Sequence, residues 1–471
     1  MSGSRGISSK YGAGIRVFTD VGGHMADPSA VAFGKYLRHL RERRGLSLSR
    51  VCEWSRSSAE PFDKGTLSRL ERGQQTPSIY RLGPLSRIYQ ISADALLERM
   101  ELDRELDRLG APETFGKTFD ELQRAGGAAI LRQDRKWDAY ACFRDSFWIA
   151  GPDKKVIAWL NVATAIRSLG KNALALHELR ELASSADLDP GQRTLLNERL
   201  SNCCRCLGDM RRAEEYADAA IAQAQELGDS RTLAYAYAAR GSAAIDQEQW
   251  QVAYDLHLKS LAAYRDGADQ DSWLLAGPSF EAQRLLMLAE CSLYLRNMSR
   301  ARRLLLAAKR LSEEHDLPSG LAYSELFLGW IDEAAGRIDQ ALARWRRAAA
   351  LAARVDNPRI AFTAEVEIFR QAQDAGDVAR ARACKRRLDR LAPWIPQHIP
   401  AYKRFGLLVD QERRRAARAQ EGGTHEELPH VSAVGAPGAP DAPDTDAGRR
   451  RHHPGRRAGL SGASRITRTT G

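Results

Sequence analysis

An alanine recurs at nearly even spacing along most of this chain, each time after a turn of the kind Leu-Gly-Asp-Met-Arg-Arg-Ala. Successive anchors lie 36, 38, 40, 48, 40 and 40 residues apart. The anchors are Ala139, Ala175, Ala213, Ala253, Ala301, Ala341 and Ala381. A period of this length predicts a stack of seven similar structural units rather than one compact core.

A second set of positions keeps the same spacing, because a small residue stands twelve residues before six of the seven anchors. The small residues are Gly127, Ala163, Ser201, Gly241, Ala289 and Gly329, and Phe369 is the exception. This pattern resembles the tetratricopeptide (TPR) repeat, which implies that residues 119–396 form pairs of helices. The 48-residue interval predicts an insertion between Asp266 and Ser279.

The TPR resemblance also implies a right-handed solenoid whose first helices line a concave surface. Six side chains at inward offsets are candidate contacts to an effector: Asn202, Arg205, Tyr235, Gln283, Tyr294 and Trp330. Amide, charged and aromatic groups together suit an extended peptide, whose backbone needs hydrogen-bond partners and whose side chains need pockets. For any one of these residues the alternative is a solvated position or a contact between repeats.

A short amphipathic segment nearer the N-terminus, residues 66–73, has the pattern of a DNA-reading helix. Leu67 and Leu70 fall on one helical face, and Gly73 suits the left-handed residue that ends a helix. The other faces carry polar and basic side chains of the kind that hydrogen-bond base edges and phosphates. The candidate DNA contacts are Lys64, Thr66, Ser68, Arg69 and Arg72.

Four further short helices are predicted around this segment, within residues 30–100. Apolar residues recur at helical spacing before it, and Ser47 is placed to cap a second helix. After it, a fourth helix is expected to turn four side chains inward: Ile79, Leu82, Leu85 and Ile88. Five short helices with the third facing outward indicate a helix-turn-helix domain.

These residues resemble the Cro-type (XRE) helix-turn-helix domains of phage repressors. The resemblance implies that the third helix enters the major groove of double-stranded DNA and that Glu71 is structural. The chain departs from that family in a long connection, residues 56–65, before the third helix. It also has Pro84 inside the fourth helix, where a proline removes a hydrogen-bond donor and should kink the chain.

Net charge is unevenly distributed along the chain. Residues 1–100 hold 16 Lys and Arg against 9 Asp and Glu, and residues 412–471 hold 11 against 7. The intervening residues are balanced, so the excess of +11 lies at the two ends. A basic N-terminal domain on a neutral body fits phosphate binding by that domain alone.

Composition divides the rest of the chain. Residues 1–29 are predicted to be a flexible leader, within which Met25 is a second candidate for the first residue of the protein. Residues 101–118 are predicted to be a linker helix and residues 397–420 a helix that caps the solenoid. Residues 421–471, rich in Gly, Ala, Pro and Arg, are predicted to be a disordered basic tail.

The motifs of several other classes are missing from the sequence. No phosphate-binding Gly-rich loop, zinc-protease motif or nucleophile elbow occurs, so we expect no catalytic residue, metal or cofactor. The cysteines lie in helical patterns, which indicates reduced thiols and a cytoplasmic location. No apolar run is long enough for a membrane span.

A Cro-type domain followed by TPR repeats resembles the peptide-responsive regulators grouped as the RRNPP family. That resemblance implies an all-α transcription regulator that binds DNA as a homodimer and senses a peptide or protein effector with its TPR body. Two alternatives stay open at this point. The repeats form a scaffold that tethers a partner protein to DNA, or the whole chain is an adaptor that binds no DNA.

Overall fold

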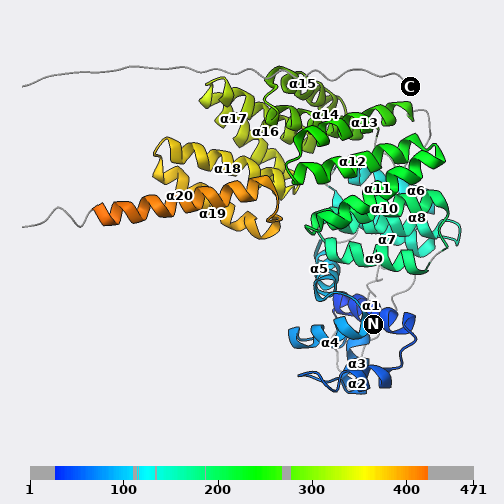
Figure 1. Ribbon diagram of the computed structural model, residues 1–471. Helices are drawn as coiled ribbons and strands as arrows, with labels where there is room; N and C mark the ends of the chain where they lie inside the picture. Colours follow the sequence, from blue (N-terminus) through cyan, green and yellow to red (C-terminus); the bar gives the residue numbers. More distant parts are fainter. Residues whose placement is uncertain are drawn as a thin grey trace, which may run out of the picture. The chain divides into compact units, whose positions relative to one another are not determined.

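The computed structural model describes residues 27–422 except 110–113, 115, 133–134, 186 and 268–276. All regular secondary structure in these residues is helical (Figure 1), which confirms the all-α prediction. Almost all of the predicted leader and tail, Met25, and the middle of the predicted insertion lie outside the described residues.

Five helices form the N-terminal domain, with the third exposed on one side as the sequence predicts. They are α1 (Pro28–Arg43), α2 (Leu48–Trp54), α3 (Lys64–Glu71), α4 (Ile79–Tyr89) and α5 (Ala93–Leu109). The α4 helix continues through Pro84. One inward assignment is wrong: Ile79 is 72% exposed. It is the first residue of α4, where the helix has not yet reached the core that Leu82 and Leu85 enter.

The polar stretch predicted as a linker helix is the second half of α5. Leu102 and Leu106 are buried in the same hydrophobic cluster as the N-terminal domain. Asp103 is also buried, and its carboxylate pairs with Arg99 at 2.8 Å. The α5 helix packs against both α1 and α9, so this segment is part of the packed structure.

Seven helix pairs follow, as the seven anchors predict. The first helices are α6 (Phe119–Arg132), α8 (Lys155–Ser168), α10 (Pro190–Cys206), α12 (Ser230–Asp246), α14 (Gly277–Tyr294), α16 (Pro318–Ala334) and α18 (Pro358–Asp374). The second helices are α7 (Lys136–Ile149), α9 (Asn172–Ser185), α11 (Met210–Leu227), α13 (Trp250–Asp266), α15 (Met298–Glu314), α17 (Ile338–Arg354) and α19 (Val378–Leu391).

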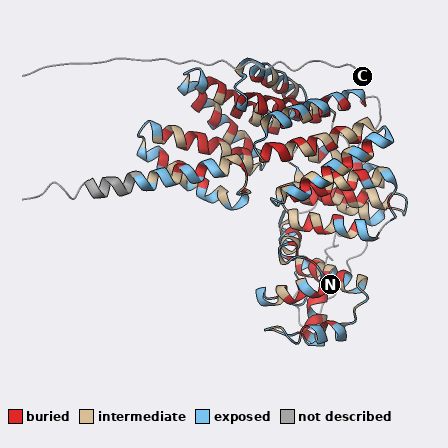
Figure 2. Ribbon diagram, viewed as in Figure 1, coloured by how far each residue is buried: buried red, intermediate tan, exposed pale blue. Residues whose placement is uncertain are grey.

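The anchor alanines are the points where each second helix meets its first helix. All seven are buried, and each lies near the start of a second helix. The Ser201 hydroxyl donates to the backbone oxygen of Ala213 at 2.7 Å, which joins a small-residue position directly to its anchor. Figure 2 shows that the buried residues lie on the faces that the helices turn toward one another.

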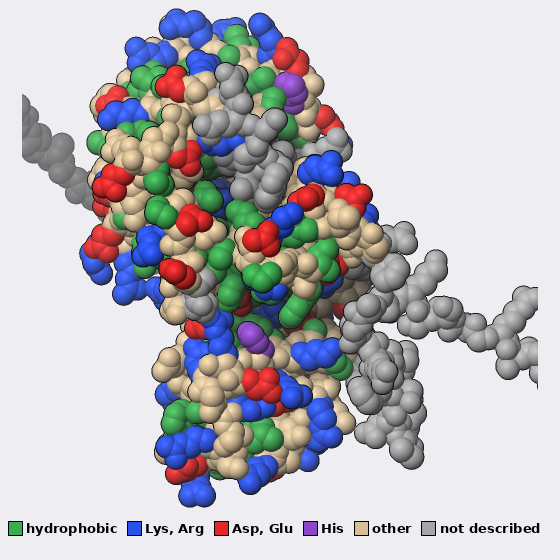
Figure 3. Space-filling view, turned by 90° about the vertical axis from the view of Figure 1, so that its right-hand side faces the viewer, with side chains coloured by type: hydrophobic (Ala, Val, Ile, Leu, Met, Phe, Trp, Pro, Cys, Tyr) green, Lys and Arg blue, Asp and Glu red, His purple; other side chains and the backbone are tan. Residues whose placement is uncertain are grey.

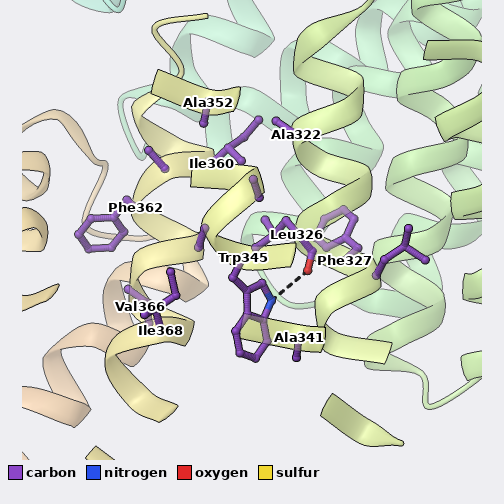
Figure 4. Packing of buried hydrophobic residues seen from close by; sticks show 14 of the residues in the cluster. Ala322, Leu326, Phe327, Ala341, Trp345, Ala352, Ile360, Phe362, Val366 and Ile368 are labelled. Carbon is purple, nitrogen blue, oxygen red and sulfur yellow. Dashed lines mark hydrogen bonds between the residues drawn. The ribbon is translucent and has the colours of Figure 1, made fainter. Parts of the chain in front are cut away.

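Small residues on the first helices make room for large rings on the second helices. The Trp345 indole of α17 lies against Gly329 of α16 and donates from Nε1 to the backbone oxygen of Leu326 at 3.2 Å (Figure 4). Gly241 faces the His257 ring in the same way. In the first repeat the ring of Phe143 meets Gly126, one residue before the predicted position.

The first helices of neighbouring repeats also pack against one another, whereas each second helix packs mainly on the first helices beside it. The layer of first helices has its weakest contact between α12 and α14. Two small hydrophobic clusters, each with buried residues of α12, α13 and α14, bridge this place. This weak contact between α12 and α14 coincides with the 48-residue interval. In that interval the connection between α13 and α14 is longer than any other between consecutive helices of the repeats.

The last repeat is covered by a short 3-10 helix, η1 (Ala392–Trp394), and by α20 (Pro400–Gly422). Phe405 of α20 lies 6.2 Å from Phe369, ring centroid to ring centroid. Phe369 therefore breaks the small-residue pattern where its ring meets α20. The chain forms two units, residues 1–413 and 414–471, and of the second only the final turns of α20 are described.

We expect Gly329→Ala to destabilise the repeats, because the added Cβ would lie 2.3 Å from Nε1 of Trp345. Overpacking of this kind costs about 1 to 3 kcal/mol, so the melting temperature should fall. Gly406→Ala in α20 is the matched control, since its Cβ would meet no atom within 4 Å. An unchanged melting temperature for Gly329→Ala would contradict this packing.

Candidate functional site

The DNA-reading candidate α3 begins at a complete N-cap. The Asp63 carboxylate accepts from the backbone N–H of Thr66 at 2.7 Å and from the Thr66 hydroxyl at 2.6 Å. These hydrogen bonds hold the pKa of Asp63 below its usual value. Thr66 is only 4% exposed, so the expectation that it lies on the outward face is wrong, because its hydroxyl serves the cap.

The other four candidate DNA contacts do leave the core. Lys64, Arg69 and Arg72 are exposed and Ser68 is half-buried. Arg69 donates to the Thr66 hydroxyl at 3.0 Å, which orients its guanidinium along the helix. Gly65 lies among them and was not singled out from the sequence. With no side chain, it leaves the backbone at the start of α3 open to close approach.

The base of α3 is fixed to α1 by an ion pair and two glycines. Glu71 accepts from Nε and Nη2 of Arg41 at 2.6 and 2.9 Å, which is the structural role the sequence suggests for it. A Cβ on Gly34 would lie 2.4 Å from the Leu70 oxygen, and one on Gly73 would lie 2.4 Å from Cα of Val31. The two helices therefore cross closely enough to set the angle of α3.

The long connection before α3 is ordered by its own contacts. The Ser55 hydroxyl accepts from the Phe62 N–H at 2.9 Å, and the Phe62 ring is buried. Glu60 pairs with Arg81 of α4 at 3.2 Å and accepts from the Ser78 hydroxyl at 2.9 Å. The additional residues therefore form a braced loop that presents α3.

Hydrogen bonds join the N-terminal domain to the first repeats. Glu98 of α5 accepts from the backbone N–H of Leu174 at 2.7 Å, at the start of α9. Arg44 pairs with Glu181 of α9 at 3.1 Å. Tyr36 donates to Glu178, also of α9, at 3.1 Å. A movement of α9 would therefore change the hydrogen bonds and ion pairs that it makes with α1, α5 and Arg44.

Asp246 of α12 lies among the first helices, which carry the six candidate effector contacts. Its carboxylate is 1% exposed and pairs with Arg205 of α10 at 2.6 Å and Arg359 of α18 at 3.1 Å. His398 lies 3.7 Å away. Burial alone would raise the pKa of Asp246, but the two guanidinium groups hold it well below the usual range. Repeats that are distant in sequence thus meet through the first-helix layer.

Two candidate effector contacts are engaged within the protein. Arg205 is the partner of Asp246, although the sequence analysis predicts it as a contact to an effector. The Asn202 amide donates to the Glu198 carboxylate at 2.7 Å and to its backbone oxygen at 3.2 Å. Tertiary contacts set these roles, and the sequence carries no signal for the pairing of Arg205 with Asp246.

The other four candidates lie in two places. Tyr235 packs on Phe280 with ring centroids 4.5 Å apart, and Gln283 is exposed on α14. Tyr294, 37% exposed, stacks on Trp250 at 3.7 Å, and its edge meets the Trp330 ring at 6.0 Å. The Nε1 donor of Trp330 is buried with no acceptor. This aromatic group retains both apolar surface and an unused hydrogen-bond donor.

Glu290, one turn before Tyr294, was not among the predicted site residues. Burial raises its pKa to about 7, while the Arg359 charge acts in the opposite direction. No hydrogen bond or ion pair to another described residue satisfies its carboxylate. An acidic side chain with a raised pKa beside an aromatic group marks a candidate ligand site.

Charge in the body is balanced overall but divided between layers. The second helices α15, α17 and α19 each carry more Lys and Arg than Asp and Glu. Figure 3 shows Lys and Arg side chains along the top edge of the view, at the height of α15 in Figure 1. Their exposed arginines without a carboxylate partner among the described residues are Arg300, Arg302, Arg303, Arg310, Arg346, Arg354, Arg382, Arg386 and Arg390.

The remaining groups offer little chemistry. All seven cysteines are free, and burial raises the pKa of the Cys203 thiol to about 12. The described residues contain no group of three or more His, Cys, Asp or Glu side chains placed to hold a metal ion. None of the described helices has the length and apolar character needed to cross a membrane.

Comparison with known proteins assigns the N-terminal part of the chain. Residues 32–100 match the helix-turn-helix domain family. This span contains α2 to α5 and most of α1. No curated protein matches the chain.

Several solved structures resemble larger parts of the chain. PlcR of Bacillus thuringiensis, solved with the peptide PapR7 and DNA, is 15% identical, covers 63% of this chain and 99% of its own, and has a TM-score of 0.38. A Rap protein complexed with competence and sporulation factor is 13% identical over 59% and 77%, with a TM-score of 0.46. The Rap conjugation gene regulator of plasmid pLS20, solved with the Phr* peptide, is 11% identical over 77% and 98%, with a TM-score of 0.43.

Glu290 generates a prediction about pH and stability. The folded protein keeps a proton on Glu290 up to about pH 7, whereas an unfolded chain loses it near 4.5. Stability therefore falls as pH rises through this window, by up to about 3 kcal/mol. Glu290→Gln cannot ionise, so its stability relative to the parent protein should increase from pH 4.5 to 7.5 in urea titrations.

The matched control is Glu226→Gln, which replaces an exposed carboxylate of α11. Parallel stability curves for Glu290→Gln and the parent protein across this range would show that Glu290 is ionised in the folded state.

Proposed function

We propose that this protein is a sequence-specific, DNA-binding transcription regulator whose repeats sense a peptide or protein effector. The observation that carries the DNA assignment is the exposed basic side of α3, held on a braced helix-turn-helix core. Lys64 and Arg69 supply positive charge and hydrogen-bond donors on that side. Side chains of these types bind base edges and phosphates in the major groove.

Binding as a homodimer fits this architecture, because paired α3 helices read two half-sites of a pseudo-palindromic operator. The effector would act on the spacing or angle of the two domains. It shifts this equilibrium only if it prefers one arrangement over the other. The contacts of α9 with α1 and α5 give the repeats a direct physical connection to each DNA-binding domain.

The effector assignment rests on the first-helix layer. The stacked rings of Trp250 and Tyr294 and the unused donor of Trp330 lie beside Glu290. These groups suit a ligand that brings both apolar and hydrogen-bonding atoms, as a peptide does. We propose no catalytic role for the protein and a place in the cytoplasm, where such a regulator meets DNA.

Replacement of Lys64 and Arg69 by alanine should weaken binding to a duplex selected from a random pool by the parent protein. A specific base contact is worth about 1 to 3 kcal/mol, so the loss should be at least tenfold in an anisotropy titration. The circular dichroism spectrum should not change, because both side chains are exposed. The matched control replaces Arg104 and Arg108, two exposed arginines of α5. Equal losses in the two double variants would refute the assignment of α3.

Tyr294→Ala should leave DNA affinity intact but abolish the response to an effector. The change removes the ring that stacks on Trp250 without touching the N-terminal domain. The response is measured as the change in operator affinity on adding the low-molecular-weight fraction of an extract from the native cells. Trp394→Ala, which removes an exposed ring from η1, is the control. A Tyr294→Ala protein that responds like the parent would move the effector site elsewhere and favour the scaffold alternative.

A further inference from the structure

Arg284 of α14 is a buried cation that has no anionic partner among the described residues. Its side chain is 3% exposed, and no described carboxylate pairs with it. Arg205 and Arg359 are paired with Asp246. The charge of Arg205, a second cation, acts on Arg284 in the same direction as burial does. Burial lowers the pKa of Arg284 to about 10.

The hydrogen bonds around Arg284 are incomplete. Its Nη1 bonds to Nδ1 of His257 at 3.1 Å, and its Nε is buried without an acceptor. Because the guanidinium can only donate, Nδ1 must accept, and the neutral imidazole then carries its proton on Nε2. That Nε2 is also buried without a partner. Two neighbouring residues thus hold donors that the described part of the chain does not satisfy.

A cluster of aromatic rings lies beside Arg284. The guanidinium carbon lies 5.0 Å from the centre of the Phe280 ring. Phe280 in turn contacts Tyr235 at 4.5 Å and Tyr264 at 4.8 Å, centroid to centroid. The group spans α12, α13 and α14, where the layer of first helices has its weakest contact. Side chains of the two first helices, α12 and α14, therefore meet in this group through Tyr235 and Phe280.

An unpaired buried cation is costly, because desolvation is repaid only by a well-placed counter-charge and hydrogen bonds. The contact with Phe280 and the bond to His257 offset part of that cost. Unsatisfied buried groups of this kind are uncommon in folded proteins, and ordered water, an ion or a functional role can account for them. An anion that accepts hydrogen bonds has the chemistry that complements both donors.

We propose that Arg284 and His257 form a subsite for the carboxylate of an organic ligand, with Phe280 and Tyr235 as its apolar walls. An arginine fork binds a carboxylate through two parallel hydrogen bonds. A free phosphate shares the anionic chemistry but has no apolar part for the rings to cover. The C-terminal carboxylate of a peptide has both parts. The inference rests on the proposed effector function for its biological meaning, and its test measures anion binding alone.

The test uses the full chain and two probes that differ only in charge, N-acetylphenylalanine and its amide. The acid should bind more tightly than the amide by roughly 10- to 100-fold, the usual worth of hydrogen bonds to a charged group. Titration calorimetry measures both affinities, and thermal melts at constant ionic strength record the stabilisation. Inorganic phosphate, added in a separate melt, should stabilise less than the acid does.

Arg284→Met separates a ligand site from a structural role. Removing an uncompensated cation should leave the melting temperature equal or higher, while the preference for the acid disappears. Arg284→Lys keeps the charge without the fork, so it should retain only part of that preference. Arg205→Met is the matched control, because it deprives buried Asp246 of a partner and should lower the melting temperature.

Equal affinity for the acid and the amide in the parent protein would overturn the proposal. So would an Arg284→Met protein that melts as low as Arg205→Met and still prefers the acid. Stabilisation by phosphate equal to that by the acid would show a general anion site and refute the carboxylate assignment. None of these readings depends on DNA binding, so this proposal and the proposed function fail independently.

Discussion

The ion pairs of Asp246 join a neighbouring repeat and a distant one. Its carboxylate is shared by Arg205, 41 residues away, and Arg359, 113 residues away. A buried carboxylate requires such partners, and removing both arginines would leave a desolvated charge whose cost is about 3 to 5 kcal/mol. Because each repeat otherwise contacts mainly its neighbours, the bond to Arg359 of α18 connects repeats that do not stack on each other.

Asp246 and Arg284 differ in how their buried charges are satisfied. Both are buried ionic groups on neighbouring first helices, but one is fully paired and the other holds donors without acceptors. The paired group belongs to the framework. The unpaired one lies where α12 and α14 contact most weakly, so a ligand there gains binding energy from groups already desolvated. It would also stiffen the joint between the two halves of the repeat stack.

In the N-terminal domain, too, a few ion pairs and buried side chains set the positions of the helices. Arg41 and Glu71 align α3 on α1, and Glu60 and Phe62 brace the long connection before it. The α5 helix then connects this domain to α9 through the hydrogen bond that the backbone N–H of Leu174 donates to Glu98. The α3 helix is therefore linked to the first repeats by a short series of hydrogen bonds and packed helices.

The periodic pattern of residues along the chain was sufficient to predict the helical architecture. The anchor alanines, the small residues before them and the Leu67–Leu70 face identify seven helix pairs and a helix-turn-helix domain, because helix packing repeats at fixed offsets along the chain. The same pattern could not foresee that Thr66 caps α3, that Ile79 is exposed, or that Arg205 is taken by Asp246. Nor could it distinguish Arg284 from any other arginine of a first helix. Those roles depend on which distant helices meet, and pairing and burial of charge are decided only when the repeats curve and bring those helices together.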